Sequence, residues 1–161
     1  MASFATLFDN FNDNSLNPGI WTDGGGSNSN EQNGRLEILT SAGGAYYSVQ
    51  TTATTYNLTG TSVGVKLGDA GDQSLASLEV YPIILEDAGG DNEVFFIVFS
   101  GLIRAYKKVA GVNTSLASAT YNATTHAFLR IRETGGTTSW ETSPNGFAWT
   151  TFHSVANPIT I

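Results

Sequence analysis

Few side chains in this sequence of 161 residues have both the type and the spacing that chemistry requires. A retaining glycosidase needs two carboxyl groups about 5–5.5 Å apart. The acids near the expected central strands are Glu79, Glu86, Asp87 and Glu93. No acid follows Glu79 in the run Val80-Tyr81-Pro82, and Glu86 and Asp87 are adjacent, so they point apart or into solvent. We therefore expect no catalytic pair of carboxylates.

Other reaction centres are also not expected. His126 and His153 are the only histidines, and neither accompanies a nucleophile motif. The chain has no cysteine, and two histidines alone make no zinc pattern. The glycines at 24–26 lack the lysine and helix of a phosphate-binding loop. The sequence predicts a protein that is not an enzyme and has no cofactor.

One oxygen-rich segment invites comparison with a calcium loop. It reads Asp9-Asn10-Phe11-Asn12-Asp13-Asn14, and hard cations take such ligands. However, Phe11 stands where an EF-hand needs an oxygen, and the glycine and final glutamate of that motif are missing. A loop closed by Asx turns is the favoured interpretation, with a structural Ca²⁺ near Asp9 and Asp13 as the alternative.

Charge excludes some partners. The net charge is −7, the isoelectric point is about 4.5, and the seven basic residues do not run together. Binding to nucleic acid needs a basic stripe, so no nucleic acid partner is expected.

No apolar run approaches the roughly 20 residues of a membrane helix, so no membrane partner is expected. Met1-Ala2-Ser3-Phe4 does not resemble a signal peptide, which favours synthesis in the cytoplasm.

The dominant pattern is one of short β-runs separated by glycine, asparagine, aspartate and serine turns. No window of helical length carries an apolar stripe with a period of 3.6. Glu93–Phe99 is apolar on both faces, which predicts a central strand covered on both sides. Asn33-Gly34 predicts a hairpin turn, and Pro82 predicts a bulge or an edge. About ten to twelve strands form one all-β domain, 1–161, as an antiparallel sandwich or barrel.

The two ends of the chain resemble the concanavalin A-like lectin/glucanase (laminin-G-like) family. The C-terminal signature comprises Ala127–Glu133, Gly135-Gly136, Trp140–Gly146 and Trp149-Thr150. Phe8–Leu16 with Trp21 looks like the opening of such domains, and Glu31–Leu36 looks like their early hairpin. The resemblance implies a two-sheet antiparallel jelly-roll sandwich with a curved front sheet. The family includes laminin-G-like modules, carbohydrate-binding modules, glycoside hydrolases and domains on bacteriophage tail and capsid proteins, so the resemblance implies that this chain is one of these.

Sugar-binding faces use exposed aromatic rings with nearby amides and acids. Five residues lie on expected strands whose faces carry both apolar and polar side chains. These candidates for a glycan-binding groove are Tyr81, Tyr106, Trp140, Arg104 and Glu141. Four other large rings are expected in the core: Trp21, Trp149, Phe95 and Phe99. Glu133 and Glu141 are expected to pair with Arg130 or Arg132 across neighbouring strands.

The leading hypothesis is a non-catalytic binding or accessory module on the virion surface, decorating a capsid or tail. Its expected partners are other virion proteins, a second copy of itself, and surface glycans held weakly; multivalency would strengthen such contacts. The first alternative is a carbohydrate-binding module of a secreted glycoside hydrolase. A degenerate hydrolase and a purely structural virion protein also remain open.

Overall fold

The chain is all-β. The computed structural model describes residues 9–24, 29–38, 48–51, 56–74, 78–87 and 89–159, and across these ranges it contains twelve strands and no helix. This confirms the all-β part of the predicted fold class. The chain divides into two compact units, Met1–Tyr56 and Asn57–Ile161, which are described separately below. The prediction that they make one domain stays a prediction.

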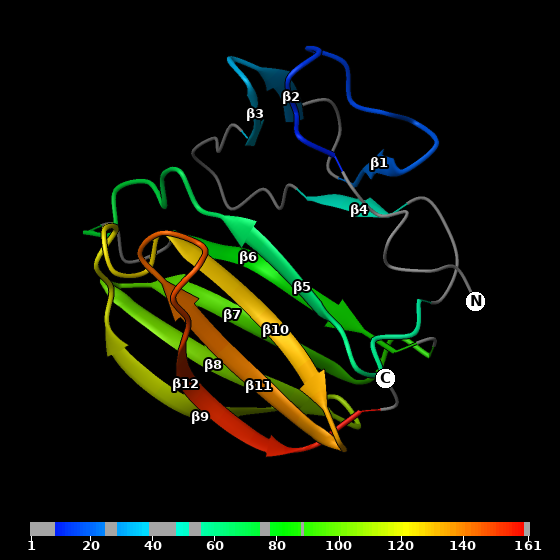
Figure 1. Ribbon diagram of the computed structural model, residues 1–161, viewed down its shortest axis with the longest axis vertical. Helices are drawn as coiled ribbons and strands as arrows, with labels where there is room; N and C mark the ends of the chain where they lie inside the picture. Colours follow the sequence, from blue (N-terminus) through cyan, green and yellow to red (C-terminus); the bar gives the residue numbers. More distant parts are fainter. Residues whose placement is uncertain are drawn as a thin grey trace. The chain divides into compact units, whose positions relative to one another are not determined.

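The described residues of the first unit form two small antiparallel sheets (Figure 1). β1 (Trp21–Asp23) pairs with β4 (Val49–Thr51), and β2 (Ser29–Gln32) pairs with β3 (Arg35–Ile38). The β2–β3 hairpin confirms the predicted Asn-Gly turn, because Asn33 and Gly34 take φ values of 56° and 70°. The sequence pattern also predicts strands at Ser3–Asp9 and Ala45–Gln50. Residues 3–8 and 45–47 lie outside the described residues, and β4 covers Val49 and Gln50 of the second.

The second unit is a sandwich of two four-stranded antiparallel sheets (Figure 1). One sheet has the order β12-β11-β10-β5, and the other has the order β6-β7-β8-β9. The strands are β5 (Ser62–Lys66), β6 (Glu79–Glu86), β7 (Glu93–Phe99), β8 (Leu102–Val109), β9 (Val112–Thr120), β10 (Phe128–Thr134), β11 (Thr137–Ser143) and β12 (Thr150–Ala156). The sequence pattern also suggests an edge strand at the tail, Asn157–Ile161. This prediction is wrong over the described residues, because 157–159 form no strand.

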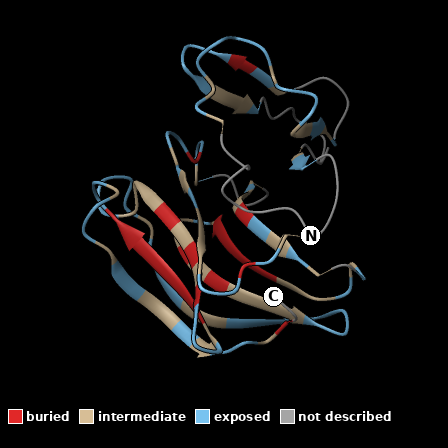
Figure 2. Cartoon of the chain, turned by 45° about the vertical axis from the view of Figure 1, so that its right-hand side comes forward, coloured by how far each residue is buried: buried red, intermediate tan, exposed pale blue. Residues whose placement is uncertain are grey.

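Two expectations about individual strands are confirmed. β7 lies inside its sheet, and its five central residues are all buried, as its continuous apolar run predicts. The register between β6 and β7 shifts between Val80 and Ile83, where Pro82 supplies no N–H for the ladder. Figure 2 shows buried residues along the strands of this unit and exposed residues at its turns.

The core of the second unit lies between its two sheets and is organised around Trp140. This side chain is fully buried, and its Nε1 donates a hydrogen bond of 3.0 Å to the carbonyl oxygen of Phe95. Trp140 belongs to β11 and Phe95 to β7, so the bond joins the two sheets. Phe96 and Phe152 also meet across the sheets, with ring centroids 6.1 Å apart. The other buried residues of this core are Ala70, Ile83, Val94, Val98, Ile103, Ala105, Leu129, Ile131 and Ile159.

Replacing the central tryptophan tests this arrangement. We expect Trp140→Phe to lower the free energy of unfolding by about 2–3 kcal/mol, because it leaves a cavity and removes the bond to Phe95. Urea denaturation of the full chain measures the change. Phe147→Ala is the matched control: that ring is 90% exposed, and its loss should change stability by less than about 0.5 kcal/mol. Equal effects of the two substitutions would contradict the proposed role of Trp140.

Candidate binding site

Two of the five predicted glycan-binding residues lie together on the β6–β9 sheet. The rings of Tyr81 and Tyr106 flank Phe95, with centroids 5.6 and 5.3 Å from it, and Tyr106 stacks on Phe95 at 10°. Val94 and Phe96 belong to the core, so the alternation of β7 turns Phe95 to the outer face. Phe95 is nevertheless 4% exposed, so the prediction that it is buried is confirmed.

Arg104 lies on the same outer face. Its guanidinium carbon is 5.6 Å from the ring centroid of Phe99, and Phe99 is half-buried. Tyr81 donates a hydrogen bond of 2.7 Å from its hydroxyl to Glu79. The polar groups around the tyrosines are therefore partly engaged with one another.

Trp140 and Glu141 do not lie on the face that carries Tyr81, Tyr106 and Arg104. The prediction that all five residues line one groove is therefore wrong. Both lie on β11, in the other sheet, and as neighbours on a strand they face opposite sides. Trp140 is opposite Ile131 and points into the core with 0% exposure, so its ring is not available to a ligand. Glu141 points to the outer face of the β5-β10-β11-β12 sheet.

Glu141 binds two arginines, which confirms the expected cross-strand pairing. It is 4% exposed and accepts bonds from Arg130 Nε at 2.5 Å and Arg132 Nη2 at 2.9 Å. Burial raises the pKa of Glu141, but the bonds from Arg132 and Arg130 lower it more, so it lies below its ordinary value. Two positive charges share one carboxylate, which leaves a surplus of one positive charge on this face.

Glu133 has a different role from the predicted one. It is 2% exposed, and its carboxylate accepts hydrogen bonds from the backbone N–H groups of Gly60 at 2.5 Å and Gly136 at 2.7 Å. The prediction that Glu133 pairs with an arginine is wrong, because its side chain lies on the opposite side of β10 from Arg130 and Arg132. It instead joins the loop before β5 to the β10–β11 turn.

Trp149 lies over the outer face of the β5-β10-β11-β12 sheet and is half-buried. The prediction that it belongs to the core is therefore wrong. The guanidinium carbon of Arg130 is 4.1 Å from the indole centroid, which is a close cation–π contact. Trp149 Nε1 donates a bond of 3.0 Å to the carbonyl oxygen of Gly146. On the same face, Lys66 Nζ lies 5.8 Å from the ring centroid of Phe128.

The loop between β11 and β12 is held by its own side chains. Ser143 Oγ accepts from the backbone N–H groups of Asn145 and Gly146, at 3.2 and 2.9 Å. Asn145 Oδ1 accepts from those of Phe147 and Ala148, both at 2.9 Å. Gly146 has a φ of 77°, and a Cβ there would lie 3.2 Å from the Phe128 ring. The loop therefore fixes the backbone of Phe147, whose ring is exposed to solvent.

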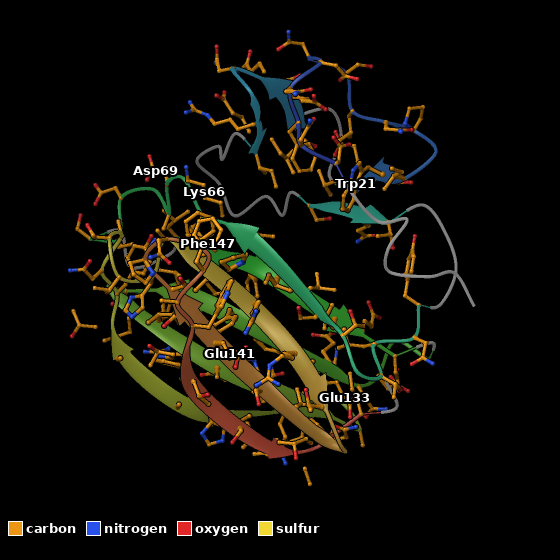
Figure 3. All side chains as sticks on the ribbon, viewed as in Figure 1. Trp21, Lys66, Asp69, Glu133, Glu141 and Phe147 are labelled. Carbon is orange, nitrogen blue, oxygen red and sulfur yellow. The ribbon has the colours of Figure 1, made fainter. Side chains whose placement is uncertain are left out.

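These groups enclose an open hollow of about 470 Å³, the Trp149 pocket. Figure 3 shows Lys66 and Phe147 at the same end of the sheet, with Glu141 farther along it. Sequence reasoning missed this pocket; the signal available was the spacing of Phe147 and Trp149 after the Asn-Gly turn. The pocket is lined by Gly64, Val65, Lys66, Phe128, Asn145, Gly146, Phe147 and Trp149.

The acids considered for catalysis have other partners. Asp87 accepts from Asn92 Nδ2 at 2.5 Å, and Glu93 pairs with Lys108. Glu86 is directly opposite Glu93, and the pKa of Lys108 is raised, chiefly by its hydrogen bond to Glu93 and further by the charge of Glu86. Across the described ranges, no cluster of three or more acidic or histidine side chains has the arrangement of a metal site.

His126 and the side chains of the first loop form local hydrogen bonds. His126 Nδ1 accepts from the backbone N–H of Asn122 at 3.0 Å. Asp9 accepts from the N–H of Phe11 and Asp13 from that of Ser15, both at 3.0 Å, which are the Asx turns expected for this loop. Calcium near these two aspartates stays a prediction.

No protein-family model matches the chain, and comparisons with curated proteins and with solved structures likewise found no match. In the part of the chain that the structure describes, no helix is long and apolar enough to cross a membrane.

Removal of the Glu133 charge should make stability less dependent on pH. Its bonds from the N–H groups of Gly60 and Gly136 lower the pKa of this carboxyl below 4.5, so its stabilising contribution is complete above pH 4.5. That contribution is lost as the pH falls through the native pKa. We expect Glu133→Gln to lower the unfolding midpoint in urea clearly at pH 7 and progressively less towards pH 3. Glu86→Gln, at an exposed position, is the control. A constant difference between wild type and Glu133→Gln at every pH would contradict this assignment.

Proposed function

We propose that this chain is a non-catalytic binding module whose Trp149 pocket takes a sugar unit of a glycan. The observation that carries the proposal is the grouping of three aromatic rings, those of Phe128, Phe147 and Trp149, around one open hollow. A ring face packs against the apolar face of a pyranose, and nearby polar groups bind its hydroxyls.

The chemistry of the pocket supports binding without catalysis. None of the eight described residues that line it carries a carboxyl, imidazole, thiol or hydroxyl group. A glycosidase would need two carboxyl groups beside the bound sugar. Glu141, a carboxylate on the outer face of the same sheet, is buried and held by two arginines.

The proposal extends to family and setting. The sandwich of two four-stranded sheets supports a concanavalin A-like jelly roll. The residues from Ala127 to Thr150 that resemble this family also build the pocket and the sheet beneath it. With an acidic chain free of cysteine, we propose a virion surface protein, made in the host cytoplasm, that decorates a capsid or tail. Enrichment of the protein with purified particles tests this setting, and its absence from particles would favour the module of a secreted glycoside hydrolase.

Binding to sugars is tested on a glycan array and then by calorimetry with the oligosaccharide that binds best. We expect saturable binding that Phe147→Ala weakens about fivefold, because an exposed stacking ring is lost while the fold stays intact. Val112→Ala removes another exposed apolar side chain, 66% exposed on β9, and should leave binding unchanged.

Tyr106→Ala distinguishes the two aromatic surfaces of the sandwich. Its ring belongs to the row Tyr81–Phe95–Tyr106 on the other sheet, so the proposal expects unchanged affinity. Loss of binding in Tyr106→Ala with retention in Phe147→Ala would place the sugar on that row instead. An array without any signal would contradict a sugar-binding function.

A further inference from the structure

We propose that the Trp149 pocket prefers an acidic pyranose, a sugar whose ring carries a carboxylate. This inference rests on the sugar-binding function proposed above and assigns the class of sugar. Three properties of the pocket support it: the character of its polar groups, the charge of the surrounding face, and the ammonium of Lys66, for which the described residues offer no carboxylate within 4.0 Å.

The polar side-chain groups that line the pocket are donors. Asn145 Oδ1 already accepts two backbone N–H bonds, which fixes the orientation of the carboxamide and leaves Nδ2 as the group available to a ligand. Lys66 contributes an ammonium, which can only donate. Trp149 Nε1 is occupied by the carbonyl of Gly146. A ligand that satisfies these groups must present acceptors, and a carboxylate has two oxygens with only acceptor capacity.

The charge of this face is positive although the chain is acidic. Lys66, Arg130 and Arg132 lie on the outer side of the β5-β10-β11-β12 sheet, in register across β5 and β10. Glu141 balances one of the two arginines, and among the described residues Lys66 has no carboxylate within 4.0 Å. Counted over Lys66, Arg130, Arg132 and Glu141, this part of the face has two more positive than negative charges, which attracts an anion.

The geometry places charge and ring side by side. Lys66 Nζ lies over the ring of Phe128, and Gly146 abuts the same ring from the loop. A pyranose packed between Phe147 and Trp149 would thus bring a ring carboxylate towards Lys66 and Asn145. On the tyrosine row of the other sheet, Tyr81 already donates its hydroxyl to Glu79, and the guanidinium of Arg104 lies over Phe99.

The test compares uronate oligosaccharides with their neutral methyl esters. Trimers of galacturonate, glucuronate and mannuronate are each titrated into the full chain by calorimetry, next to the ester of the same trimer. At least one uronate should bind about fivefold more tightly than its ester at low salt, and the difference should shrink at about 0.5 M NaCl because salt screens the charges.

Two variants with the same change of charge locate the effect. Lys66→Met should remove the preference for the acid over its ester, so that the two trimers bind with equal affinity. Lys107→Met, on β8 in the other sheet, should preserve the preference. Binding of neutral sugars with no preference for any uronate would overturn this inference and leave the sugar-binding function standing. A preference that survives Lys66→Met would also overturn it, whereas failure of every sugar to bind would contradict the proposed function itself.

Discussion

The burial of Trp140 between the two sheets determines which side chains face outward on the second unit. Its indole donates to the carbonyl of Phe95 on the opposite sheet, which fixes the side of β11 that faces the core. Glu141, the next residue, must then face outward, where Arg130 and Arg132 reach it. Arg130 in turn supports Trp149 by stacking on its ring. The position of the pocket is thus a consequence of how the core is packed.

The sequence predicted the architecture better than the binding surface. Strand positions follow from local patterns, such as the continuous apolar run of β7 and the Asn33-Gly34 turn, because each pattern acts on residues close in the chain. Trp140 and Trp149 show the limit of such patterns. Both tryptophans belong to the same C-terminal signature, yet one is buried and the other lies over the outer face. Which tryptophan enters the core depends on the packing of the second sheet, and that packing is not local.

The acidic side chains show the same limit. Glu141 was assigned to the correct arginines because strand pairing within a hairpin is short-range. Glu133 binds the backbone of Gly60, which is 73 residues away along the chain, and no local pattern indicates that contact.

Because the Trp149 pocket is open and carries few polar groups, single sugar contacts there are expected to be weak. Several copies on one surface would compensate through multivalency.

In the proposed complex, the sugar binds the outer face of the β5-β10-β11-β12 sheet, beside the loop between β11 and β12. Amide and indole chemical shifts of the isotope-labelled full chain, followed during titration with the best-binding trimer, test it most directly. The account predicts shifts at Lys66, Gly146, Phe147 and the Trp149 indole N–H, with the Trp140 indole N–H unchanged. Shifts confined to the Tyr81–Tyr106 row would contradict it.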